Sequence, residues 1–214
     1  MQIDFVFGLF ILIVSVILHE VSHGYMANYL GDPTARLAGR LTLNPVSHID
    51  PVGSILLPLL LVITNSPLLI GYAKPVPYNP YNLPGKYDEG LVAFAGPAVN
   101  IFLALLFGLA IRVFGAALPL PWVEAFATIC LVNIVLALFN LLPVPPLDGS
   151  KVLSSVFAMV HPSLEQGYNT FRLNFERLGV LSGTLLILLL FFALSSFFFG
   201  SVVAPTFRLI TGLA

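Results

Sequence analysis

Residues 14–30 read VSVILHEVSHGYMANYL, and this stretch joins a run of bulky apolar residues to three ionisable ones. His19, Glu20 and His23 fall within five positions of a segment that is otherwise suited to lipid. An ionisable side chain at the centre of a membrane helix costs roughly 2.5–3.5 kcal/mol on insertion scales, and such residues are by default functional. The three residues are therefore the first candidate site.

The composition places the whole chain in a membrane. Of its 214 residues, 58% are hydrophobic and 9% are charged, and the mean hydropathy is +0.98. A soluble domain carries roughly 25% charged residues, so no soluble fold of this length could bury so much apolar surface. The chain is expected to be an all-α polytopic protein whose solvent is the lipid bilayer. Its net charge of −1 argues against nucleic acid as a partner.

Five apolar runs are long enough to matter, at 3–28, 52–71, 91–114, 122–142 and 178–203. They predict about four to six transmembrane helices in a single intramembrane domain over residues 1–214. Its core motifs lie in 15–30, 91–114 and 122–150, and an extra C-terminal helix is expected over 178–203. Residues 72–82 are crowded with prolines and aromatic residues, which predicts extended chain at the membrane edge.

The spacing of the two histidines indicates a metal site. His19 and His23 stand four residues apart, so on a helix they share one face and can bind one ion. Glu20 lies beside them in the pattern H-E-x-x-H, where it serves as the general base of a zinc enzyme. The alternative is that the histidines are satisfied packing residues. Because two of only four histidines fall in this costly segment, metal binding is favoured.

A catalytic zinc ion needs a third protein ligand, and Asp148 is the best candidate. It follows a long apolar run in FNLLPVPPLDGSKVL, residues 139–153, whose three prolines break the helix. Irregular backbone at membrane depth is tolerated only where it lines a cavity or is buried in protein. The segment is therefore expected to deliver the carboxylate inward. The alternative is that Asp148 caps the next helix.

Several motifs together resemble the site-2 protease family of intramembrane zinc metalloproteases, which is peptidase M50-like. The matching stretches are HEVSHG (19–24), AGPAVN (95–100) and NLLPVPPLDG (140–149). NPVSHIDPVG (44–53) and GYAKPVPYNP (71–80) further resemble its short prokaryotic branch, and no inserted PDZ or CBS domain is visible.

The resemblance implies one zinc ion held by His19, His23 and Asp148, with Glu20 as the catalytic base. It also implies that Asn140 orients the substrate or stabilises the oxyanion. It further implies that Gly96 and Asn100 support helix packing near the substrate path.

The physical alternatives for the supporting residues stay open. Asn140 could equally join two helices through its amide, and the same role is favoured for Asn100. Gly96 would let two helices approach closely. His48 lies in a polar loop, where it is either a gating or supporting residue of the site or an ordinary interfacial histidine.

A shared zinc site constrains the topology. The C-terminal end of the first span and Asp148 must lie on one side of the membrane, so an even number of crossings separates them. Runs 91–114 and 122–142 supply two crossings, so run 52–71, which contains two prolines, is expected to be a re-entrant or membrane-dipping segment.

The chain is expected to be a multi-pass protein of a prokaryotic plasma membrane. The distribution of its positive residues predicts that the active site lies on the cytoplasmic side. Those expected on that side are Arg36, Arg40, Lys74, Lys86, Lys151, Arg172 and Arg177. Arg112 and Arg208 are the exceptions.

The expected reaction is hydrolysis of a peptide bond within the bilayer, as in regulated intramembrane proteolysis. Its expected substrate is a single-pass membrane protein that unwinds near the site. Extended chain at 72–80 could pair with this substrate or could equally be a simple connector. The alternative is a non-proteolytic metal-binding scaffold or transporter, which would keep the histidines without needing Glu20. The sequence leaves the oligomeric state open.

Overall fold

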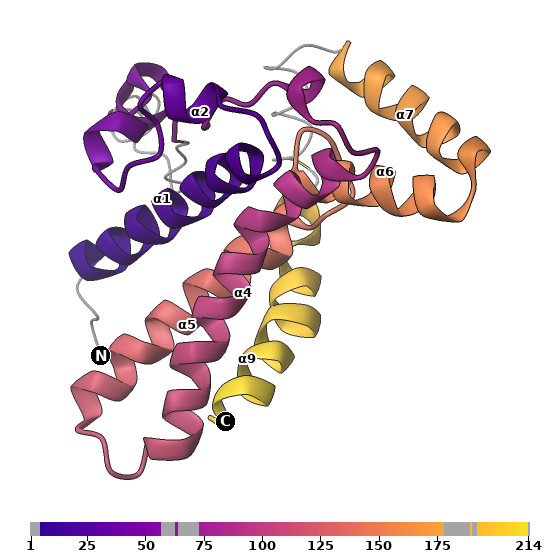
Figure 1. Ribbon diagram of the computed structural model, residues 1–214. Helices are drawn as coiled ribbons and strands as arrows, with labels where there is room; N and C mark the ends of the chain where they lie inside the picture. The colour runs from indigo at the N-terminus through magenta and orange to yellow at the C-terminus, as the bar shows by residue number, and fades with distance from the viewer. Residues whose placement is uncertain (1–4, 57–62, 64–72, 178–188, 190–191, 214) are drawn as a thin grey trace.

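The computed structural model describes residues 5–56, 63, 73–177, 189 and 192–213, and this part of the chain is helical with no strand (Figure 1). Four helices of the described ranges are long and apolar enough to cross a membrane. They are Val6–Tyr29, Asp88–Phe114, Leu120–Asn140 and Phe192–Thr211. The all-α polytopic architecture is thereby confirmed, and the number of spans lies at the lower end of the expected range.

Three of these helices form the core of the bundle: α1 (Phe5–Tyr29), α4 (Asp88–Phe114) and α5 (Leu120–Asn140). Helix α4 packs along both α1 and α5 (Figure 1). Two acidic residues in the first turn of α4, Asp88 and Glu89, complement the positive end of its helix dipole. The connection from α4 to α5 is only five residues long, which makes the two helices antiparallel neighbours.

The C-terminal span packs against the same core. Its last part comprises η4 (Phe198–Val203), a short wider turn of helix, and α9 (Ala204–Thr211). Helix α9 meets α4 at Gly108, where an added Cβ would lie 2.5 Å from Ile210 Cγ2 and 2.9 Å from Cys130 Sγ. Because no side chain fits there, glycine allows the close approach. Cys130 is fully buried in this cluster and serves as packing.

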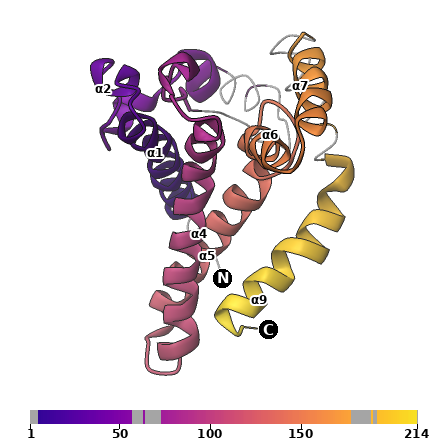
Figure 2. The ribbon, with the colours of Figure 1, turned by 45° about the vertical axis from the view of Figure 1, so that its right-hand side comes forward.

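A helical hairpin stands beside one end of the bundle (Figure 2). It consists of α6 (Asp148–Val160) and α7 (Pro162–Glu176). His161 separates the two helices, and its side chain accepts a hydrogen bond from the Ser163 N–H at 3.2 Å. Arg172 of α7 forms an ion pair with Glu89 of α4 at 3.3 Å. The hairpin is thereby held next to the start of α4.

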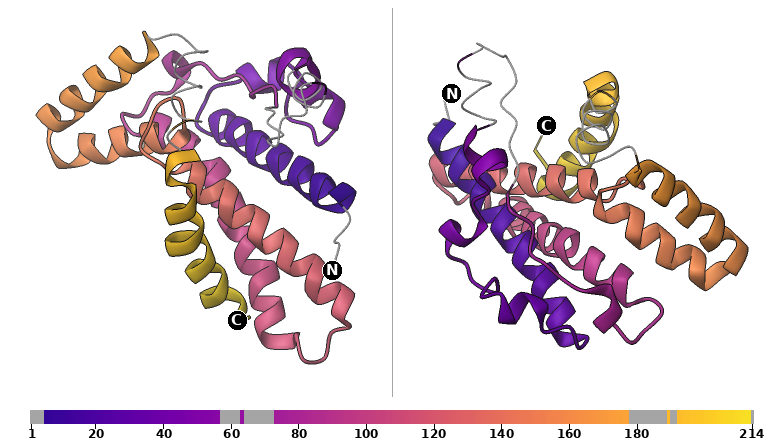
Figure 3. Two further views of the ribbon diagram at one scale, coloured as in Figure 1. Left: turned by 180° about the vertical axis from the view of Figure 1, so that it is seen from behind. Right: turned by 90° about the horizontal axis from the view of Figure 1, so that it is seen from above.

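The described part of the chain between α1 and α4 lies along one side of α1 (Figure 3). It contains the short helices α2 (Thr34–Leu37), η1 (Pro45–His48), η2 (Pro51–Leu56) and η3 (Pro80–Asn82). Residues 73–79 have no helical structure, as expected, but the extended stretch expected over 72–82 ends earlier, because Pro80–Asn82 form the helical turn η3 after the Asn79 side chain accepts a hydrogen bond from Tyr81 N. We call residues 73–79 the strap. The buried carboxylate of Asp32 fastens its end by accepting hydrogen bonds from Asn79 N at 2.6 Å and Asn82 Nδ2 at 2.7 Å.

The expected re-entrant segment at 52–71 falls mostly outside the described residues, which omit 57–62 and 64–72. The ends of the three core helices nevertheless satisfy the parity that motivated it. His23 near the C-terminal end of α1 contacts Val92 near the start of α4 and Asp148 after the end of α5. The chain from α1 to α4 therefore leaves and returns at the same end of the bundle, and α4 and α5 supply the two crossings.

Candidate metal centre and catalytic site

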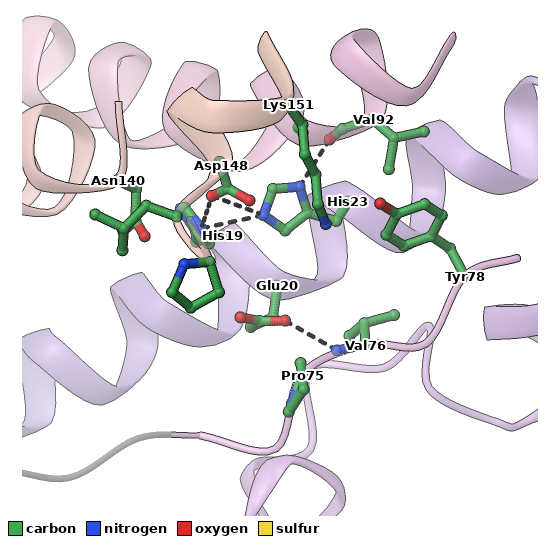
Figure 4. A pocket seen from close by; sticks show the side chains of 13 residues that line it. His19, Glu20, His23, Pro75, Val76, Tyr78, Val92, Asn140, Asp148 and Lys151 are labelled. Carbon is green, nitrogen blue, oxygen red and sulfur yellow. Dashed lines mark hydrogen bonds and ion pairs between the residues drawn. The ribbon is translucent and has the colours of Figure 1, made fainter. Parts of the chain in front are cut away.

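Three side chains from distant parts of the sequence converge at that end of the bundle (Figure 4). His19 Nε2 lies 3.1 Å from His23 Nε2, and these two atoms lie 3.2 and 3.4 Å from Asp148 Oδ2. His19 and His23 are one turn apart on α1, and Asp148 is the first residue of α6. Within the described residues, these three form the one His/Cys/Asp/Glu group spaced to hold a metal ion.

The spacing of the three ligand atoms fits zinc. A tetrahedral zinc ion with bonds of about 2.0–2.1 Å sets its ligand atoms about 3.3 Å apart, which matches the three separations. The chemistry of the donors agrees. The Val92 carbonyl, 2.7 Å from His23 Nδ1, can only accept a hydrogen bond, so Nδ1 carries a proton, and in the neutral imidazole Nε2 presents a lone pair to the centre. Two imidazole lone pairs and a carboxylate oxygen that face one point are a donor set suited to a zinc ion.

Asp148 reaches the histidines because α6 starts directly against the end of α5. An added Cβ at Gly149 would collide with the Leu141 carbonyl and lie 2.5 Å from Leu142 O, so only glycine permits this turn. The Asp148 side chain makes no capping hydrogen bond to α6, and its Oδ2 faces the imidazoles.

Gly96 of α4 lies directly behind the two imidazoles. A Cβ at this position would lie 2.5 Å from His23 Nε2 and 2.7 Å from His19 Cε1. The glycine does more than let two helices approach, because it provides the space that both imidazoles occupy.

Glu20 lies beside the metal centre and contacts the strap. Its Oε2 accepts a hydrogen bond from the Val76 N–H at 2.9 Å (Figure 4). Val76 is flanked by Pro75 and Pro77, which have no N–H, so the triplet offers a single backbone donor. That donor binds Glu20 Oε2 and so fixes one oxygen of the carboxylate. The other oxygen, Oε1, is left to accept a proton.

Asn100 contacts the metal centre from the inner side of the bundle. Its Oδ1 lies 2.6 Å from His19 Nδ1, so this residue does more than join helices. Behind it lie Asn133 of α5 and Ser15 of α1, whose roles sequence reasoning missed. Both are polar residues within apolar runs, and their position in such runs is the signal that could have found them.

A cavity of about 210 Å³ joins the metal centre to the strap. His19, Glu20, His23, Asn140 and Asp148 all line it. Asn140 donates one N–H to Leu136 O of its own helix at 3.0 Å, which leaves its second N–H for another partner.

Lys151 and Tyr78 also line the cavity, and sequence reasoning missed both as site residues. Lys151 Nζ lies 4.9 Å above the Tyr78 ring, and burial raises the pKa of the Tyr78 hydroxyl. Lys151 follows Asp148 by three residues on α6, so the helical repeat could have placed it on the same face.

His48 does not line the cavity. Its Nε2 donates to the Thr42 carbonyl at 2.8 Å, and its own carbonyl accepts from Lys74 N at 2.9 Å. His48 therefore holds the start of the strap, one step away from the metal centre.

The sequence is similar to known proteins of one family. The family model described as peptidase family M50 matches residues 7–190. The Bacillus subtilis (strain 168) protein named "Putative zinc metalloprotease YwhC" is 40% identical over 154 residues, which cover 68% of this chain and 66% of that protein. The Mycolicibacterium smegmatis relative of the same description, Rip2, is 33% identical over 152 residues, or 68% of this chain and 57% of that protein. The matches thus span less than two thirds of these relatives. No solved structure matches the chain.

Proposed function

The chain belongs to peptidase family M50, and from that premise we propose that it is a zinc metalloprotease that cleaves membrane-spanning proteins within the bilayer. One observation carries the proposal. His19, His23 and Asp148 converge within 3.4 Å of one another, and Glu20 lines the same cavity as these three ligands. A site that only stored or carried a metal ion would not need that carboxylate.

His19, His23 and Asp148 would hold the zinc ion, which supplies Lewis-acid polarisation of a carbonyl and a more acidic water when bound. Glu20 accepts the proton of the attacking water and returns it to the leaving amine. The Val76 N–H keeps the Glu20 carboxylate oriented toward the cavity. The second N–H of Asn140 and the Lys151 ammonium are the donors in the cavity suited to the charge that develops on the substrate oxygen.

The proposed substrate is a single-pass membrane helix that unwinds at its end. Two features support this. The strap is extended chain that lines the cavity through Pro75, Val76 and Tyr78, so an unwound substrate could lie along it as an added strand. The second feature is an apolar cavity of about 390 Å³ between the end of α5 and the C-terminal span. It adjoins the cavity that holds Glu20, because Leu147 lines both, so an apolar substrate segment could lie next to the site.

The protein is a multi-pass membrane protein, and we propose the plasma membrane of a prokaryote with the site on the cytoplasmic side. The support is the charge distribution. The basic residues of the loops and of the α6–α7 hairpin, among them Arg40, Lys74, Lys86 and Arg172, belong to segments at the end of the bundle that carries the metal centre. The positive-inside rule assigns such an end to the cytoplasm.

The test is a Glu20→Gln variant reconstituted in liposomes with a single-pass reporter helix that carries a Gly-Pro pair near its cytoplasmic end. Loss of the general base should slow cleavage by roughly 10²–10⁴-fold, while the zinc content stays at the wild-type level. The matched control is Glu165→Gln, which removes a carboxylate that pairs with Lys86 on the surface at 3.5 Å. Cleavage at the wild-type rate by Glu20→Gln would favour the non-proteolytic scaffold or transporter.

A further inference from the structure

We propose that Asn100, Asn133 and Ser15 form a directed hydrogen-bond chain that fixes the tautomer of His19 and so prepares its Nε2 atom to bind the metal ion. The inference rests on the proposed zinc site, and it adds Asn133 and Ser15 as positioning residues that act on His19 through Asn100. The chain crosses all three core helices, because Ser15 belongs to α1, Asn100 to α4 and Asn133 to α5.

The direction of the chain is set at its far end by a backbone carbonyl. The Ile129 carbonyl lies 2.9 Å from the Asn133 side chain, and a carbonyl can only accept a hydrogen bond. The amide nitrogen of Asn133 must therefore face Ile129, which leaves its oxygen to face Asn100. A flipped Asn133 amide would place its Oδ1 atom against the Ile129 carbonyl oxygen.

Asn133 in turn orients Asn100, which contacts His19. Asn133 Oδ1 lies 2.8 Å from the Asn100 amide, so Asn100 must present its nitrogen there. Its oxygen then faces His19 Nδ1 at 2.6 Å, and because that oxygen only accepts, Nδ1 must carry the proton. In the neutral imidazole, His19 Nε2 is then left with its lone pair, and this atom lies 3.2 Å from Asp148 Oδ2 and 3.1 Å from His23 Nε2.

Ser15 supports the chain at a second point. Its hydroxyl oxygen lies 3.0 Å from Asn133 Nδ2, and its backbone carbonyl lies 3.5 Å from Asn100 Nδ2. Both contacts take hydrogen atoms from the amide nitrogens, so they agree with the direction set by Ile129.

The burial of these residues leaves the hydrogen-bond chain only one direction. Asn100 and Asn133 are 0% exposed and Ser15 is 3% exposed, so no water competes for their hydrogen bonds. A network that only joined helices could close on itself, whereas this one ends on a metal ligand. In the other tautomer of His19, an N–H would occupy the ligand position of Nε2, and a lone pair would face the buried oxygen of Asn100.

The test uses an Asn133→Leu variant, which keeps the size of the side chain but removes the acceptor that orients Asn100. Metal-free protein labelled with ¹⁵N in its histidine rings reports the tautomer directly, and His19→Gln identifies the signals of His19. In the neutral imidazole of wild-type His19 we expect a protonated Nδ1 and an unprotonated Nε2. In Asn133→Leu we expect a mixture of tautomers and a roughly 10–100-fold weaker zinc affinity in a chelator competition.

Two further comparisons separate the chain from general effects on folding. Thr128→Val removes a polar group on α5 that donates only to Glu124 O of its own helix at 2.9 Å, and its zinc affinity should stay within about twofold of wild type. Ser15→Ala removes one of the two acceptors of Asn133 Nδ2, so its effect should be smaller than that of Asn133→Leu. Ser15→Thr keeps the hydroxyl and should restore the affinity. If Asn133→Leu fails to fold, this Ser15 pair carries the test.

An unprotonated Nδ1 on wild-type His19 would overturn the inference, as would an unchanged tautomer and zinc affinity in Asn133→Leu. Failure of the proposed function gives a different result. In that case the tautomer is fixed and zinc binds as expected, but no reporter helix is cleaved.

Discussion

At Gly96 the absence of a side chain creates the space for the metal centre. In Gly96→Ala, the new methyl group would lie 2.5 Å from His23 Nε2 and 2.7 Å from His19 Cε1, so it must push both imidazoles out of position. We expect zinc affinity to fall by more than the roughly 10–100-fold that is typical of changes behind a metal ligand, measured by chelator competition.

The control for this prediction is Gly8→Ala on α1, where nothing lies within 4 Å of the added methyl group. It should bind zinc as the wild type does. Equal zinc affinities for the two alanine variants would show that Gly96 does not define the ligand positions.

Asp32 is the residue that couples the strap to pH. Burial alone would raise its pKa, but hydrogen bonds from Thr34, Asn82 and the Asn79 N–H lower it below the usual value of Asp. The unfolded chain therefore binds the proton more tightly than the folded one. The stabilisation by Asp32 is fully present above its unfolded pKa of about 3.9 and is lost as the pH falls through the lower folded pKa.

The Asp32→Asn variant tests this prediction. Its amide would direct N–H groups at other donors. At pH 7 the free energy of unfolding should therefore be about 1–3 kcal/mol lower than that of wild type. The difference from wild type should shrink below about pH 4. A difference that is the same at pH 3 and pH 7 would contradict the role of the Asp32 charge.

Among the elements, the strap contributes a single backbone hydrogen bond to Glu20, the proposed catalytic base. In Val76→Pro the N–H that binds Glu20 is lost, and a misplaced base can cost up to about 10²-fold in rate. We expect kcat of reporter cleavage to fall by roughly 10–100-fold with little change in KM. Val76→Ala keeps the N–H and should retain most of kcat, so equal losses in the two variants would assign the effect to packing of the Val76 side chain.

The turn between α5 and α6 is the element that delivers Asp148. A methyl group in Gly149→Ala would meet the carbonyls of Leu141 and Leu142, which belong to the backbone and cannot move aside. We expect the variant to lose about 1–3 kcal/mol of stability and most of its zinc. Gly167→Ala on α7, where the added methyl meets nothing within 4 Å, is the control. Full zinc occupancy of Gly149→Ala would show that the turn tolerates a side chain.

At the scale of the whole molecule, the metal centre ties the topology of the spans to function. The α4–α5 connection and the strap lie at opposite ends of the core helices (Figure 1). We expect a cysteine at Ala116 to react with a membrane-impermeant maleimide from outside the cell. A cysteine at Tyr81, which is 97% exposed, should react only from the cytoplasmic side. The native Cys130 is fully buried and should not react. Labelling of Tyr81→Cys from outside would invert the proposed orientation.

The sequence was informative where chemistry depends on local spacing. The four-residue interval between His19 and His23 and the broken helix before Asp148 were enough to predict three ligands that the fold brings together. Contacts that depend on packing between helices were not predictable in this way. The direction of Asn100 toward His19, the use of the Val76 N–H on Glu20 and the position of Lys151 all follow from how α1, α4, α6 and the strap meet.

The central claim is that residues from both halves of the chain hold one zinc ion beside a catalytic glutamate. The most direct measurement is the zinc bound per chain, by elemental analysis of purified wild type, Asp148→Ala and Glu20→Gln. We predict close to one zinc ion per chain in wild type and Glu20→Gln, and a loss of most of it in Asp148→Ala. Undiminished zinc in Asp148→Ala would contradict the account, because the ion would then be held without the carboxylate that the fold brings to His19 and His23.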